Sequence, residues 1–149
     1  NRGHSSECTT NAINSVADYN IKTCLHIILG IPGESWQDMM DTADYISRLP
    51  VSGVKLHHLH IIKNTPLEKI AKDKNYKMIA FKEYVSTACD FIERLRPDIL
   101  IHRLTGDRAI NSLIEPKWGL QKGTVVQAIH DEFKKRCTWQ GFLYKENII

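Results

Sequence analysis

The sequence predicts an α/β fold in which parallel strands alternate with helices. Three short apolar runs, at residues 21–29, 53–62 and 99–104, are nearly continuous, as is typical of strands buried on both faces of a parallel sheet. Amphipathic segments fill the intervals between these runs. Because parallel strands need a crossover connection, usually a helix, this alternation favours repeated βα units in one sheet.

Helices are expected at residues 5–18, 35–46, 67–71, 81–95 and 124–136. Ser5 or Ser6 suits the N-cap of the first, and Ser35 with Asp38 forms a capping box at the second. Helical periodicity predicts the core-facing side chains. They are Trp36, Met39, Met40, Ala43 and Ile46; Val85, Ala88, Ile92 and Leu95, flanked by Tyr84 and Phe91; and Val126, Ile129 and Phe133.

Three such units do not close a barrel, so the predicted sheet has exposed edges and one face to be covered. Either the final helix folds back over that face, or a second copy of the chain packs against it. We therefore expect the isolated chain to self-associate through an exposed strand edge.

Composition narrows the class of protein. The 149 residues, 42% hydrophobic and 25% charged, are typical of one globular domain. The net charge of +3 is small, so it does not by itself predict a nucleic-acid interface. We find neither a membrane span nor a signal-peptide pattern, and expect a cytoplasmic protein with no membrane partner.

The cysteines are Cys8, Cys24, Cys89 and Cys137, and none of them is close to another in the sequence. Because the short ligand spacings typical of metal sites are missing, we expect no metal site within this chain. Cys24 and Cys89 lie in apolar patterns, which predicts core positions for both.

Ligands of parallel α/β sheets bind at the carboxyl ends of the strands. Three segments qualify, at residues 30–34, 61–67 and 105–108. The first, Gly-Ile-Pro-Gly-Glu, makes a tight turn into a helix N-terminus, where a ligand can approach the backbone. A purely structural turn explains this segment equally well.

The second strand carries a group of histidines. Strand alternation places His58 and His60 on one side with Leu56, while Lys55 and His57 face the other. No face therefore presents three metal ligands, and the histidines either line a ligand cavity or are satisfied within the core. On the third strand, Arg103 beside His102 is a natural anchor for a carboxylate or phosphate.

Residues 26–34, His-Ile-Ile-Leu-Gly-Ile-Pro-Gly-Glu, resemble the fifth-strand motif GxIxGxxxE of radical S-adenosylmethionine (SAM) enzymes. That motif lies along the adenine of SAM. Ile28 and Gly30 occupy its Ile and second Gly, while His26 replaces the first Gly. Further matching segments follow the same order as in an uncharacterised radical SAM family, often described as iron–sulfur oxidoreductases, that is similar to the Elongator catalytic subunit. They include residues 1–4, 54–57, 63–67, 102–107 and 139–141.

The resemblance implies that the chain is the C-terminal half of a partial TIM-type barrel. Residues 1–104 would form half-barrel βα units, and residues 105–149 a family-specific C-terminal extension. In such enzymes a CxxxCxxC-like loop holds a [4Fe–4S] cluster, which cleaves SAM to a 5′-deoxyadenosyl radical. This chain contains no such loop, and it begins with Asn1 rather than Met. We therefore expect SAM and the cluster in a longer parent protein, and no activity from this chain alone.

The resemblance also implies roles for individual residues. Arg2 would pair with the carboxylate or ribose region of SAM. The other residues expected to bind SAM are Ile28, Gly30, Pro32 and Gly33 on one side, and Ile61, Ile62 and Lys63 on the other. From their facing in the strands, the expected substrate-side residues are His57, His60, His102, Arg103 and Asp107.

Two functions remain open from the sequence. The chain is either part of a radical SAM oxidoreductase or transferase, or a non-catalytic binding domain derived from a half-barrel. The substrate is unknown. Similarity to the Elongator subunit suggests tRNA, while small molecules and proteins remain alternatives.

Overall fold

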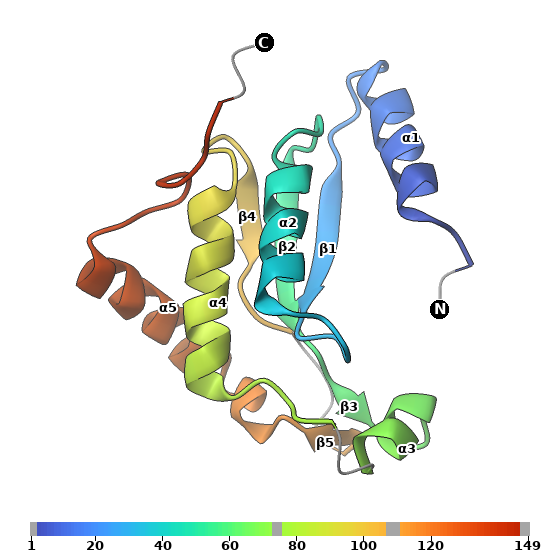
Figure 1. Cartoon of the computed structure of the whole chain (residues 1–149), viewed down its shortest axis with the longest axis vertical. Coiled ribbons are helices and arrows are strands. Elements are labelled where there is room, and N and C mark those ends of the chain that lie inside the picture. The colour runs from blue at the N-terminus through green and yellow to red at the C-terminus, as the bar shows by residue number, and fades with distance from the viewer. Residues whose placement is uncertain (1–2, 73–75, 107–110, 147–149) are drawn as a thin grey trace.

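A parallel sheet with helices packed on one face forms the centre of the molecule (Figure 1). The computed structural model describes residues 3–72, 76–106 and 111–146. Three strands, β1 (Cys24–Leu29), β2 (Gly53–His58) and β4 (Leu100–Arg103), pair in the order β1-β2-β4, and both pairings are parallel. The predicted α/β class and parallel sheet are therefore confirmed.

The helices are α1 (Ser6–Ala17), α2 (Trp36–Ile46), α3 (Pro66–Lys72), α4 (Phe81–Arg94) and α5 (Lys122–Arg136), with a 3-10 turn, η1, at Lys117–Leu120. Ser5 caps α1 by accepting a hydrogen bond from the amide of Cys8. The capping box predicted for Ser35 and Asp38 is present at α2. Among the described residues, no helix combines the length and apolarity needed to cross a membrane.

One face of the sheet is packed against α2 and α4, which lie in front of the strands in Figure 1. Val54 and Leu56 of β2 are fully buried on this covered face, together with Met40 and Ala43 of α2. We call the other side the open face. It carries the alternate residues of β1, and Cys24, His26 and Ile28 are all exposed.

The core differs from the sequence prediction at five side chains. In α5, Val126 was expected to face the core, but it is only half-buried and its neighbour Val125 is buried instead, because the face of α5 that packs on α4 is turned by one residue. Cys24, expected in the core, is exposed because β1 has helices on only one side, whereas Cys89 is buried as predicted. Trp36 is 45% exposed, since it lies in the first turn of α2 beyond the sheet. Tyr84 and Phe91, expected only to flank the core, are fully buried because α5 and the η1 segment enclose α4 from the other side.

The second predicted strand is interrupted. β2 ends at His58, and the amide of Leu59 still bonds to the carbonyl of Leu29. The chain then turns, and β3 (Ile61–Ile62) pairs antiparallel with β5 (Leu113–Glu115) in a separate two-stranded sheet. Continuous apolarity across residues 53–62 does not reveal this change of sheet.

The last helix does not cover the open face. α5 packs against α4, with Val125 and Ile129 fully buried. Arg136 fixes this contact through ion pairs to Asp90 and Glu93 of α4, at 2.6 and 3.3 Å, and within α5 it also pairs with Glu132 at 2.8 Å. Of the two coverings expected from the sequence, the first is therefore wrong.

Arg96, in the connection from α4 to β4, joins two of the βα units. Its guanidinium donates to the carbonyls of Ser47, Leu49 and Val51 at 3.0 to 3.1 Å. It also pairs with Asp98. Since Ser47 is the C-cap of α2, this one side chain satisfies carbonyls between the end of that helix and β2.

Candidate functional site

The loop that follows β1 is a tight turn at the carboxyl edge of the sheet. The amide of Glu34 donates to the carbonyl of Ile31 at 2.9 Å, which closes a four-residue turn. Pro32 and Gly33 are its central residues, and Gly33 has φ +85°. Proline followed by a residue with positive φ is the usual chemistry of a type II turn. Gly30, with φ +80°, forms the bend between β1 and this turn.

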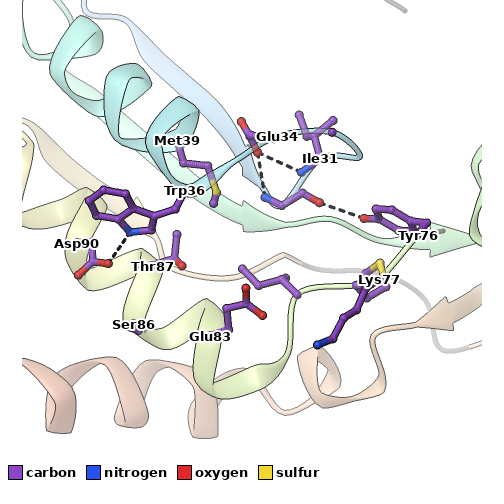
Figure 2. A pocket seen from close by; sticks show the side chains of 14 residues that line it. Ile31, Glu34, Trp36, Met39, Tyr76, Lys77, Glu83, Ser86, Thr87 and Asp90 are labelled. Atoms are coloured by element: carbon purple, nitrogen blue, oxygen red, sulfur yellow. Dashed lines mark hydrogen bonds between the residues drawn. The ribbon is translucent and has the colours of Figure 1, made fainter.

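Glu34 holds the loop closed from inside. Its Oε2 accepts hydrogen bonds from the amides of Gly30 and Ile31, both at 3.1 Å (Figure 2). Burial raises the pKa of this carboxyl group, and the two backbone bonds partly oppose the shift. The hydroxyl of Tyr76 donates to the carbonyl of Gly30 at 3.1 Å. Both backbone polar groups of Gly30 are therefore satisfied within the chain.

A cleft of about 690 Å³ lies beside this loop, between α2 and α4 (Figure 2). The indole of Trp36 donates to Asp90 at 2.8 Å on one side. Lys77 and Glu83 lie at the other side of the cleft (Figure 2). Because it is lined by the two helices of the covered face, the cleft is separate from the open face of the sheet.

The predicted SAM residues at the end of β1 differ in what they present. Ile28 is 40% exposed on the open face, so it offers apolar surface to a planar ring, and so does Ile31, which was not predicted and is 46% exposed in the loop. Gly33 has open space beside its Cα, but a side chain on Gly30 would lie 3.2 Å from Ile79. The absence of a side chain at Gly30 thus serves internal packing. Of this segment, Ile28, Ile31 and the turn are the parts whose surfaces could contact SAM.

The second predicted SAM segment lies in the small sheet. Ile61 is 3% exposed and its side chain is buried. Ile62 pairs with Leu113, and the amide of Lys63 donates to the carbonyl of Ser112 at 2.9 Å. Only Lys63 has an exposed side chain in this segment. Arg2, the remaining residue expected at SAM, lies outside the described residues.

The expected substrate residues divide between the open face and the carboxyl edge. The ring of His57 stacks on His26 of β1, with centroids 5.3 Å apart and planes at 16°. His57 has its pKa lowered to about 4 by burial and by the charges of His26, Arg103, His60 and Lys55. Nε2 of His57 is buried and has no hydrogen-bond partner in the described structure.

β4 presents His102 and Arg103 to the open face of the sheet. The register between β2 and β4 shifts, so that Val54 pairs with Ile101 and Lys55 with Arg103. Ile101 and Leu104 both pack against the core, which leaves the two intervening residues on the open side. His102 lies over Gly53, where a side chain would come within 2.6 Å of its ring.

His58 and His60 belong to a different group at the carboxyl edge. His58 is 1% exposed on the covered face, as strand alternation predicts. Its Nδ1 lies 3.2 Å from the hydroxyl of Thr105, and its ring lies 4.3 Å from that of His60 and 4.5 Å from that of Trp118. Burial, followed by the charges of His60 and His57, lowers the pKa of His58 to about 3. His58 is therefore a neutral core histidine. Asp107, the last of the expected substrate residues, lies outside the described residues.

An iron–sulfur cluster does not fit the residues that the structure describes. Within residues 3–72, 76–106 and 111–146, no three His, Cys, Asp or Glu side chains gather in a way that could hold a metal ion. Cys89 is buried, with its pKa raised to about 12 by burial. Its thiol form suits the core rather than a metal ligand, because thiolates are the ligands.

Comparison with known proteins places this architecture in a family. Residues 51–135 match the family model described as the Radical_SAM C-terminal domain. The chain is 35% identical over 145 residues to YtqA, an uncharacterised protein of Bacillus subtilis, and 39% identical over 142 residues to MJ0486, an uncharacterised protein of Methanocaldococcus jannaschii. These alignments cover 97% and 95% of the chain. The chain spans about half the length of these relatives, 45% and 44% respectively.

The fold is also that of a solved structure, the archaeal Methanocaldococcus infernus Elp3 with an N-terminal deletion. The superposition has a TM-score of 0.81 at 20% identity, and covers 93% of this chain but 33% of Elp3. The family model begins just before β2 and ends in α5, so it includes most of the elements described above. This chain belongs to the radical SAM superfamily, as a member of the Radical_SAM C-terminal domain family.

Proposed function

We propose that the chain forms part of a radical SAM enzyme and supplies one wall for SAM and one wall for the substrate. The match of the family model to residues 51–135 carries this proposal. The exposed apolar surface of Ile28, at the carboxyl end of β1, supports it from the structure. When bound in the parent protein, SAM and a [4Fe–4S] cluster supply radical chemistry, with cluster ligands from outside this chain.

The residues of this chain would position SAM and shield it from water. Ile28 and the turn at Pro32 and Gly33 would lie along its adenine, with Gly30 fixing the bend. Ile62 and Lys63 would approach from the small sheet, with Ile61 supporting them from within, and Arg2 would pair with the carboxylate or ribose region. Apolar side chains would thus contact the adenine ring, while charged side chains would bind the polar end of SAM.

Anaerobic reconstitution with iron and sulfide tests the proposal. A parent protein of the length of the relatives should take up a cluster and cleave SAM, whereas the 149-residue chain should do neither. A stoichiometric cluster on this chain, with SAM cleavage, would show that its own cysteines suffice. A parent protein that takes up no cluster would contradict the enzymatic function itself.

A substitution in the wall separates SAM binding from folding. Ile28→Asp in the parent protein should weaken SAM binding by about tenfold or more, because it removes apolar contact and adds charge beside the ring. The matched control is Ile21→Asp, since Ile21 is 57% exposed and precedes β1. Equal effects of the two substitutions on SAM affinity would remove Ile28 from the site.

For the substrate we propose a tRNA base, because the motifs of the chain resemble a family that is similar to the Elongator catalytic subunit. His60, His102 and Arg103 would face it, with His57 behind the stacked His26 and Asp107 at the carboxyl edge. The mild net charge of +3 implies few phosphate contacts from this chain. The part of the salt dependence of tRNA affinity that comes from this chain should therefore be small, so substitution of its exposed lysines should change the salt slope of the parent protein little. Absence of any tRNA binding at low salt would leave small molecules or proteins as the substrate.

We also propose that the isolated chain self-associates through an exposed strand edge. Both β1 and β4 are edge strands of the sheet of the described residues, and unpaired edges are ready templates for pairing. Light scattering during size-exclusion chromatography should show a mass above 17.1 kDa that rises with concentration. A monomer at high concentration would contradict this expectation.

A further inference from the structure

A row of basic side chains crosses the open face of the sheet. The register pairs His26 of β1 with Lys55 of β2, and Lys55 with Arg103 of β4. Paired residues of neighbouring strands lie about 4.8 Å apart. His57 lies against this line through its stack on His26. We call His26, Lys55, His57 and Arg103 the basic row.

The basic row has no counter-charge in the part of the chain that the structure describes. There, neither Lys55 nor Arg103 takes part in an ion pair. Arg96 and Arg136, by contrast, are both paired with carboxylates. In the register, Ile28 pairs with the row member His57, and Gly53, two residues before Lys55, pairs with Cys24 and Leu100, so none of these neighbours carries a negative charge.

His57 gives a second, independent indication that the basic row lacks a bound partner. Its Nε2 is buried without a hydrogen-bond partner in the described structure, and buried polar atoms normally have one. Four neighbours, His26, Arg103, His60 and Lys55, all disfavour a proton on its ring, in addition to burial. A negative group at the row would oppose that repulsion and provide acceptors for the donors there.

We propose that the basic row binds an oxyanion, a carboxylate or a phosphate group, of the molecule on which the parent protein acts. The guanidinium of Arg103 offers a planar pair of N–H donors, Lys55 a point charge between the strands, and His26 a ring N–H. His26 and Lys55 lie two residues before Ile28 and His57 on the open face, and Arg103 ends β4, whereas the turn of residues 30–34 lies beyond the carboxyl end of β1. The bound group would therefore lie next to Ile28, on the amino-terminal side of that turn. This inference deepens the proposed function and depends on it only for calling the ligand a substrate.

Titration of the protein with inorganic phosphate, and separately with acetate, tests the row at constant ionic strength set with chloride. Ring resonances of His26 and His57 should shift saturably with at least one of the two anions. The pKa of His57 should rise from about 4 when the anion is bound, because a nearby negative charge favours the protonated ring. Saturation by phosphate alone identifies a phosphate group, and saturation by acetate alone identifies a carboxylate.

Variants decide whether the row is the site. Arg103→Gln and Lys55→Gln should each weaken the anion affinity by about tenfold or more. Lys82→Gln is the matched control, since Lys82 is an exposed lysine of α4 outside the row, and it should leave the affinity unchanged. Shifts that stay linear with concentration, or that survive both row substitutions, overturn the proposal.

The same titration on the parent protein separates a ligand site from internal ion pairs. If carboxylates from the rest of that protein neutralise the row, neither anion will bind, and Arg103→Gln will lower the stability of the protein; that result also overturns the proposal. The titration needs neither SAM nor a cluster. Its failure is therefore distinct from failure of the proposed radical SAM function, which cluster reconstitution and SAM cleavage report.

Discussion

The two faces of the three-stranded sheet differ in what lies on them. On the covered face, Val54 and Leu56 are fully buried under α2 and α4. On the open face, the intervening residues Lys55 and His57 are polar, and their strand neighbours His26 and Ile28 are exposed. The side chains of this six-residue strand thus alternate between a packed core and a polar surface that no described element covers. The covered face explains why the chain folds, and the open face is where its function is to be sought.

The largest expected effect compares two neighbours on β2. Leu56→Ala should lower the free energy of unfolding by about 2–5 kcal/mol, because it leaves a cavity in a packed core. His57→Ala should change it by only about 0.5 kcal/mol, the usual range for substitutions outside the core. Urea unfolding of both variants measures the contrast. Similar costs at the two positions would mean that the open face is also part of a packed interior.

The pH dependence of stability should follow two histidines of β2, His58 on the covered face and His57 on the open face, because the pKa of each is lowered in the folded chain, to about 3 and about 4. Both values lie below the ordinary histidine pKa of about 6.5, so the unfolded chain binds these protons more readily. The stability contributed by these histidines is therefore fully present above about pH 6.5 and is lost as the pH falls toward 3, by up to about 1.4 kcal/mol for each pH unit and each histidine. Thermal unfolding between pH 7 and 4 should show a shallower loss in His58→Gln. His130→Gln, at an exposed histidine of α5, should keep the slope of the unmodified protein.

A substitution in the loop after β1 should lower the free energy of unfolding by less than Leu56→Ala. Gly30→Ala forces a side chain onto a residue with φ +80° and brings it 3.2 Å from Ile79. A cost of about 1–2 kcal/mol is expected from the backbone conformation alone. Gly123→Ala is the control, because a side chain there meets nothing within 4 Å. Chemical denaturation that gave equal results for the two variants would argue against internal packing as the reason for Gly30.

The smallest effect concerns the hydroxyl of Tyr76. Tyr76→Phe removes its hydrogen bond to the carbonyl of Gly30, and should cost about 0.5–1.5 kcal/mol. The bond also ties the segment before α4 to the loop after β1, so hydrogen exchange at the amide of Ile31 should accelerate. Unchanged exchange there would show that Glu34 alone holds the loop.

Much of the fold could be predicted from the sequence, because it depends on local patterns. The capping box at Ser35 and the apolar stripe of α2 are short-range signals, and both are present in the structure. The opposite facing of His57 and His58 followed from strand alternation alone. The exposure of Cys24 and the burial of Tyr84 were missed, because burial depends on which elements cover a side chain, and periodicity does not report that.

The candidate site was less predictable. Gly30 and Ile28 were predicted through resemblance to a motif, but the hydrogen bonds of Glu34 and Tyr76 that shape the loop appear only in the structure. Tyr76 is 46 residues from Gly30 in the chain, and no local pattern joins them. The basic row depends on the register of three strands and on the shift at Arg103. Register is a tertiary property that the sequence of each strand does not specify alone.

The guanidinium of Arg96 has a consequence for how this chain comes apart. It belongs to the connection between α4 and β4, yet the carbonyls it satisfies lie between α2 and β2. Loosening either unit therefore leaves donors or acceptors of the other without partners. The two units should open as one cooperative block, with matching protection of their amides in native-state exchange. The side chain of Arg96 would thus couple the unfolding of two neighbouring βα units.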